Sequence, residues 1–87
     1  MALYSVETKL SPEIALEKAI AYFGEGGLGL ELTEQNPCCV YFEGGGGHVS
    51  VTVVAGEKKT TVELETREWD YHVKRFMREA VRPLPRC

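Results

Sequence analysis

The chain has 87 residues, of which 44% are hydrophobic and 26% charged, and its formal net charge is −3 at pH 7. These values fit one small globular domain and argue against wholesale disorder. The first ten residues lack the basic start and apolar run of a signal peptide, and no apolar stretch approaches the roughly 20 residues that span a bilayer. We therefore expect a soluble, cytoplasmic protein.

The N-terminal segment has the alternation of a strand. Within residues 2–10, polar side chains alternate with Tyr4, Val6 and Leu10. This period of two predicts a half-buried strand, with Thr8 as the one polar residue on the side that faces the core.

The next segment has helix signals at both ends. Ser11 can cap the N-terminus, and Pro12 suits the first helical position, where no backbone N–H is required. Gly24 is free to adopt a positive φ and end the helix. The predicted helix therefore covers residues 12–23. Its apolar stripe consists of Leu16, Ala19, Ile20 and Phe23.

Four further strands follow, each with apolar residues at alternate positions. Turns at residues 36–37, 44–47 and 55–59 separate them. The residues expected on the inner side of these strands are Leu28, Leu30, Leu32, Cys38, Val40, Phe42, Val49, Val51, Val53, Val62 and Leu64.

The chain ends in a second amphipathic helix, predicted over roughly residues 68–82. Either Thr66 or Asp70 could cap it. Two prolines prevent its continuation, so residues 83–87 form a tail outside a single domain of residues 1–82. The apolar face of this helix consists of Trp69, Val73, Phe76, Met77 and Ala80.

The element order β-α-β-β-β-β-α indicates the α+β class. Short connections make the last four strands an antiparallel meander, and both helices must bury their apolar stripes. We expect a twisted antiparallel sheet with both helices on one face and the strand order 2-3-4-5-1, in which the first strand lies beside the fifth. A ferredoxin-like βαβ arrangement is the alternative.

Two glycine-rich stretches resemble phosphate-binding motifs in composition, but the secondary structure expected around them differs from that of the motifs. Gly24, Gly26 and Gly29 have G-x-G-x-x-G spacing, yet they follow a helix and precede a strand, the reverse of the dinucleotide motif. The glycines at residues 44–47 lead into a strand rather than a helix N-terminus, and His48 follows them instead of a lysine. We predict a hairpin turn for the second stretch, and no nucleotide or other cofactor at either.

The cysteines and histidines are expected to be structural or solvated. Adjacent Cys38 and Cys39 should point to opposite faces of a strand, which disfavours a disulfide between them and favours a reducing compartment. No candidate ligands have zinc spacing, so no metal is expected. His48 should lie on the outer sheet face opposite Glu43, and His72 should pack beside the apolar stripe of the last helix.

Charge is distributed unevenly along the chain. Residues 67–87 contain six basic and three acidic residues, whereas residues 1–66 contain four basic and ten acidic residues. Intervals of three and four predict an exposed basic stripe on the last helix, formed by Lys74, Arg75, Arg78 and Arg82. The outer face of the sheet collects Glu7, Glu31, Glu43, Glu63 and Glu65. An acidic sheet face would repel a nucleic-acid duplex.

These patterns favour a non-catalytic interaction module, an adaptor or subunit. It would dock a protein partner or a second copy through the basic helix face or the outer sheet face, with no membrane or nucleic-acid partner. The alternative is a small-ligand-binding domain that uses the space between helices and sheet, near Tyr22, Phe23, Trp69 and Met77. A small enzyme that uses the outer-face carboxylates is a third hypothesis.

Overall fold

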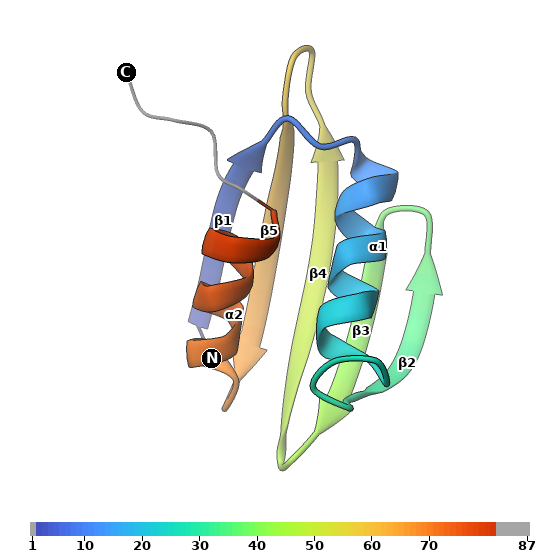
Figure 1. Ribbon diagram of the computed structural model, residues 1–87, viewed down its shortest axis with the longest axis vertical. Helices are drawn as coiled ribbons and strands as arrows, with labels where there is room; N and C mark the ends of the chain where they lie inside the picture. The colour runs from blue at the N-terminus through green and yellow to red at the C-terminus, as the bar shows by residue number, and fades with distance from the viewer. Residues whose placement is uncertain (1, 82–87) are drawn as a thin grey trace.

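Both helices pack on one face of a five-stranded antiparallel sheet (Figure 1). The structure is a computed structural model and describes residues 2–81. The strands are β1 (Ala2–Thr8), β2 (Glu31–Asn36), β3 (Cys39–Gly44), β4 (Gly47–Ala55) and β5 (Thr60–Arg67). The helices are α1 (Pro12–Phe23) and α2 (Asp70–Arg75), and α2 continues directly into a π-helical segment, η1 (Phe76–Ala80).

The strand order is β1-β5-β4-β3-β2, and every neighbouring pair is antiparallel. The predicted α+β class and the predicted order are therefore confirmed. The ferredoxin-like alternative is wrong, because β1 lies at the edge of the sheet beside β5.

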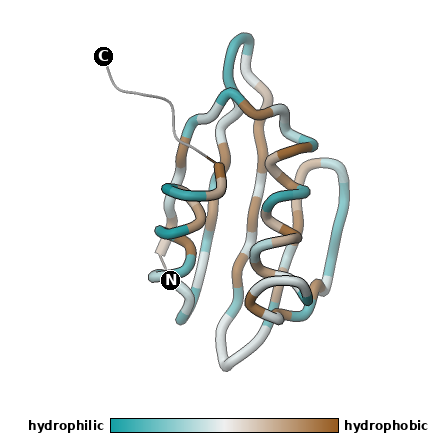
Figure 2. The backbone as a smooth tube through the Cα atoms, in the orientation of Figure 1, coloured by the Kyte–Doolittle hydropathy of each residue, from teal (hydrophilic) through white to brown (hydrophobic). Residues whose placement is uncertain are grey.

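The core lies between the two helices and the inner face of the sheet. The predicted inner residues of β4 and β5 are all buried, from Val51, Val62 and Leu64 at 0% exposure to Val53 at 6%. Figure 2 shows hydrophobic residues along the helices and central strands, whereas β2 and the β4–β5 connection are hydrophilic. Period-two and helical patterning therefore located the core correctly in the middle of the sheet.

Strand β2 differs from its prediction. Leu28 and Leu30 precede the strand, and all six residues of β2 are exposed. Leu32 pairs with buried Phe42 and so faces the inner side, as predicted, but it lies on the edge strand and 37% of it is exposed. The pairing with β3 shifts between Leu32 and Glu34, so a bulge interrupts the regular register in the second half of the strand.

The N-terminal end of α1 is as predicted, whereas the C-terminal end differs in backbone conformation. Ser11 caps the N-terminus and accepts a hydrogen bond from the Ile14 N–H at 3.3 Å. Gly24 does not adopt a positive φ; its φ is −78°, so this prediction is wrong. Glycine is required there for space, because an added Cβ would lie 2.6 Å from the Ile20 carbonyl oxygen.

The four-glycine stretch forms a hairpin turn, as predicted. Gly45 and Gly46 have φ values of 57° and 80°, the left-handed pair that two-residue hairpin loops require. The Trp69 indole N–H donates to the Gly44 carbonyl at 3.0 Å. Gly47 approaches β5 so closely that a Cβ would lie 2.0 Å from the Arg67 carbonyl oxygen. The glycines therefore allow the chain to turn between β3 and β4 and to pack closely against β5.

The second helix begins later than predicted. Glu68 has a positive φ of 74° and turns the chain out of β5, and Trp69 occupies the N-cap position without a side-chain hydrogen bond. Neither predicted cap is correct. Thr66 is buried in β5 and donates to the His48 carbonyl, while Asp70 is the first helical residue. The predicted end at residue 82 lies outside the described residues, as does the tail.

Cys38 and Cys39 form a disulfide, so the prediction that they would not bridge is wrong. The prediction assumed that both residues lie in a strand. Cys38 instead occupies the turn between β2 and β3, where its N–H donates to the Asn36 side chain at 3.2 Å, and alternation no longer separates the two side chains. Cysteine usage therefore gives no support for a reducing compartment, and a cytoplasmic location stays a prediction from sequence.

Candidate interaction surfaces

The predicted basic residues of the last helix lie on the molecular surface. Lys74, Arg75 and Arg78, hereafter the basic stripe, are all exposed. Val73 and Phe76 on the opposite side of the helix are fully buried. Arg82, the fourth predicted member, lies outside the described residues. The amphipathic spacing therefore separates an apolar face from a cationic one.

Glu79 lies among the cations of the basic stripe. Its carboxylate contacts the Arg75 Nε at 3.1 Å and an Arg78 guanidinium nitrogen at 3.8 Å. The hydrogen bond to Glu79 raises the pKa of Arg75, whose guanidinium is charged at every pH relevant to binding. Exposed pairs of this kind contribute little to stability. Their main effect is to reduce the net positive charge of the stripe, and the hydrogen bond also orients the Arg75 guanidinium.

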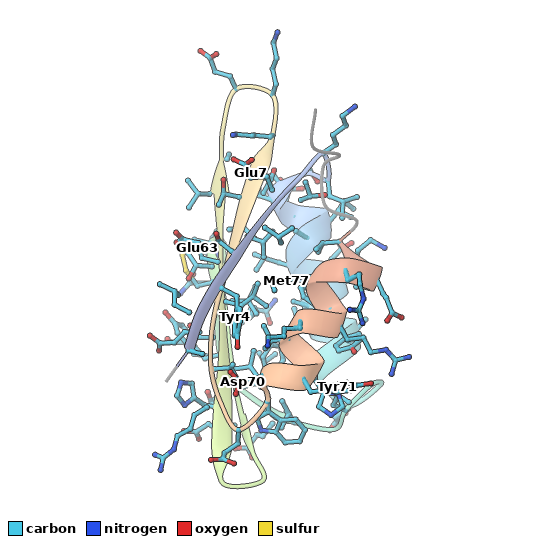
Figure 3. The ribbon with its side chains drawn as sticks, turned by 90° about the vertical axis from the view of Figure 1, so that its left-hand side faces the viewer. Tyr4, Glu7, Glu63, Asp70, Tyr71 and Met77 are labelled. Carbon is cyan, nitrogen blue, oxygen red and sulfur yellow. A yellow bond between two sulfur atoms is a disulfide. The ribbon has the colours of Figure 1, made fainter. Side chains whose placement is uncertain are left out.

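Tyr71 is an exposed aromatic residue one helical turn before the basic stripe. It projects from the first turn of α2 (Figure 3), and 67% of it is exposed. The cations follow it at three, four and seven residues, so all four side chains share one helix face. Sequence reasoning missed Tyr71 because it sought cations alone. The same intervals of three and four residues that predicted the basic stripe also place Tyr71 on its face.

A hydrogen bond ties α2 to the edge strand β1. The Tyr4 hydroxyl donates to an Asp70 carboxylate oxygen at 2.7 Å, and Figure 3 shows the two side chains between strand and helix. Lys74 Nζ lies 5.7 Å from the centroid of the Tyr4 ring, within cation–π range. The hydrogen bond to Asp70, with a smaller effect of burial, raises the pKa of Tyr4 above its ordinary value of 10.0.

The raised pKa of Tyr4 predicts how the stability of the protein depends on pH. The folded state holds the hydroxyl proton more tightly than the unfolded chain, so this stabilisation is complete below pH 10.0 and is lost as pH rises through the folded pKa. We expect Tyr4→Phe to lower the midpoint of thermal unfolding between about pH 7 and 9. The difference from wild type should shrink above pH 10.0. A difference that stays constant to about pH 11 would show that the hydroxyl has its ordinary pKa.

The predicted outer-face carboxylates share the uncovered side of the sheet. Strand pairing aligns Glu31, Glu43, His48 and Arg67 in one row across four strands. His48 lies opposite Glu43, as predicted, and its Nε2 is 3.6 Å from Glu65. The remaining predicted carboxylates of this face are Glu7 and Glu63.

This face is less acidic than the sequence suggested. Glu7 forms an ion pair with Lys59. Arg67 was assigned to the basic C-terminal segment, but it belongs to β5 and stands in the row that contains Glu43. A charge sum by segment cannot reveal this pairing, because strand register decides which residues become neighbours.

Several hollows lie on the surface of the described residues. One, of about 430 Å³, lies on the outer sheet face and includes Tyr41, Glu43 and His48. Two more, of about 560 and 550 Å³, lie between α1 and β2 and share Ile20. The charged residues that line these two hollows are all carboxylates: Glu13, Glu17, Glu25 and Glu31.

The space predicted between helices and sheet is occupied near Phe23 by aromatic packing. The Phe23 ring lies 5.1 Å from that of Phe76, 5.7 Å from that of Phe42 and 5.0 Å from that of Tyr22, between centroids. His72 packs beside Trp69, with ring centroids 5.5 Å apart, in the half-buried position predicted for it.

Within residues 2–81, no group of three or more His, Cys, Asp or Glu side chains could hold a metal ion. No helix in the same range is both long and apolar enough to cross a bilayer. Comparisons with protein-family models, curated proteins and solved structures give no match to this chain.

Proposed function

We propose that this protein is a non-catalytic interaction module that docks an acidic surface of a protein partner through α2 and η1. The observation that carries the proposal is the single helix face that exposed Tyr71 shares with the basic stripe. Tyrosine and arginine are enriched among the residues that dominate binding energy at protein interfaces. The cations would speed encounter with an acidic partner, and Tyr71 would supply apolar contact.

The contacts beneath this face support the proposal. The hydrogen bond from Tyr4 to Asp70 fixes the first turn of α2 against β1. Phe76, fully buried, fixes the following segment against α1 through its contact with the Tyr22 ring. A rigid helix presents its side chains with little loss of entropy on binding, which favours affinity.

A small-ligand-binding domain remains the second candidate. The hollows between α1 and β2 favour it, because their volumes of about 560 and 550 Å³ fall in the range of ligand sites. Their apolar walls and carboxylates suit a ligand that combines an apolar body with a positively charged group. The enzyme hypothesis has weaker support, since His48 and Glu65 form a surface pair with side chains 30% and 46% exposed.

The interaction proposal predicts a specific loss of binding. The variant combines Tyr71→Ala, Lys74→Glu and Arg78→Glu, and it keeps Arg75 so that the pair with Glu79 remains. We expect a folded protein whose affinity for its partner falls at least about tenfold. The measurement is capture from native cell extract on immobilised protein, quantified at low and high salt, since screening weakens the charged contacts.

A matched control separates the basic stripe from net charge. Lys9→Glu with Lys18→Glu makes the same change in charge at two exposed lysines outside α2 and η1. This control should capture the partner as wild type does. If the stripe variant binds as well as the control, the stripe is only a solvated helix face and the proposed docking surface is wrong.

A further inference from the structure

The two edges of the sheet differ in a way that matters for association. Edge strands expose backbone hydrogen-bonding groups, and natural proteins protect them with bulges and charges. Strand β2 has both kinds of protection, with a bulge between Leu32 and Glu34 and two exposed glutamates. Strand β1 pairs with β5 in unbroken register over all seven of its residues, and it contains neither proline nor glycine.

Apolar side chains accompany this regular edge. Tyr4 and Val6 face the core but are only half-buried, whereas Val62 and Leu64 on the neighbouring strand are fully buried. Leu3, on the outer side, is 73% exposed, more than any other large hydrophobic residue of residues 2–81. Figure 3 looks directly onto this edge, with β1 in front and α2 beside it. One more strand beyond β1 would cover the half-buried pair.

We propose that β1 pairs antiparallel with β1 of a second copy of this chain about a two-fold axis, so that the two sheets become continuous. The axis passes through Ser5, the middle residue of the strand, because this register gives the longest pairing. Tyr4 then lies opposite Val6 of the second copy, a favourable aromatic and β-branched pair on the inner side.

The second copy suits this edge because the pairing is self-complementary. In the register centred on Ser5, each Glu7 lies opposite Leu3 of the other copy, so the two carboxylates are not directly opposed. Like charges directly opposite one another would destabilise the pairing. The inference goes beyond the proposed function: it concerns the β1 edge, which meets the basic stripe where Lys74 contacts the Tyr4 ring.

Disulfide trapping tests the pairing at its two-fold axis. The variant is Ser5→Cys in a Cys87→Ser background, so that the terminal thiol cannot contribute. Residues directly opposite in antiparallel strands have Cβ atoms about 5 Å apart. We expect mild oxidation to convert most of the folded protein to a covalent dimer. Glu34→Cys in the same background, at the exposed β2 edge, should stay monomeric.

Sedimentation equilibrium tests the same inference without an introduced thiol. Wild type should approach twice the chain mass of 9.7 kDa as concentration rises. Ser5→Lys opposes two lysines across the axis at an exposed position, so it should shift the equilibrium several-fold towards monomer while circular dichroism stays unchanged. A wild type that remains monomeric throughout, or equal cross-linking of Ser5→Cys and Glu34→Cys, would overturn the proposal.

Discussion

Val51→Asp is expected to unfold the protein. Val51 lies in the central strand β4 between Val40 of β3 and Leu64 of β5, and all three residues are 0% exposed. An aspartate there would place an unpaired charge among aliphatic side chains, at a cost comparable with the roughly 5–15 kcal/mol by which small domains are stable. Circular dichroism and the dispersion of amide proton resonances should both show loss of the folded state.

Thr52→Asp is the control for this prediction. Thr52 is the next residue of β4 and lies half-exposed on the outer face, opposite Glu63. Its replacement brings two carboxylates together and should cost no more than about 1 kcal/mol. If Thr52→Asp and Val51→Asp are destabilised equally, the assignment of inner and outer faces in β4 is wrong.

Phe76→Ala is expected to have the second largest effect. Phe76 is fully buried in η1, and its ring lies 5.1 Å from that of Phe23 and 5.4 Å from that of Tyr22. Truncation removes the contacts that join the second helix to α1 and should cost about 3–5 kcal/mol. The midpoint of thermal unfolding should fall by more than about 10 °C, measured by calorimetry.

Met77→Ala provides the comparison for Phe76→Ala. Met77 is the next residue of η1 and is only half-buried against the core. Its truncation should cost clearly less than that of Phe76. Equal losses would mean that the π-helical segment does not set the two residues at different depths.

The sequence was sufficient to predict the centre of this fold. In β4 and β5, a strict period of two coincides with one buried and one solvated face, so Val51 and Leu64 could be placed without a structure. The order of β2 to β5 followed from short connections between antiparallel neighbours, whereas no sequence pattern fixed the place of β1 beside β5. In β4 and β5, the alternation of apolar and polar residues matches the buried and solvated faces of the folded sheet.

Prediction failed where tertiary contacts decide the local structure. Leu32 faces the inner side opposite buried Phe42, but its place on the edge strand leaves 37% of it exposed, which alternation alone could not predict. The second helix begins without a side-chain cap, because Glu68 has a positive φ and turns the chain out of β5. The Asp70 carboxylate instead accepts a hydrogen bond from Tyr4, which lies 66 residues earlier in the chain. No pattern within the helix itself could show that contact.

The candidate surfaces were predicted in part. Helical spacing placed Lys74, Arg75 and Arg78 on an exposed face, but the contacts of Arg75 and Arg78 with Glu79 depend on side-chain geometry. The disulfide between Cys38 and Cys39 was not predicted, because the turn was expected at residues 36–37 and lies at residues 37–38. Residues on strands become neighbours through register, and residues in turns through the exact length of the loop.

Lysine-reactive cross-linking in native cell extract tests the proposed docking surface most directly. The chain has five lysines, and Lys74 is the one in the basic stripe. If α2 and η1 dock a protein partner, cross-links to another protein should form at Lys74 well above those at exposed Lys9, Lys18 and Lys58. Cross-links spread evenly over these lysines, or concentrated away from Lys74, would contradict the proposal.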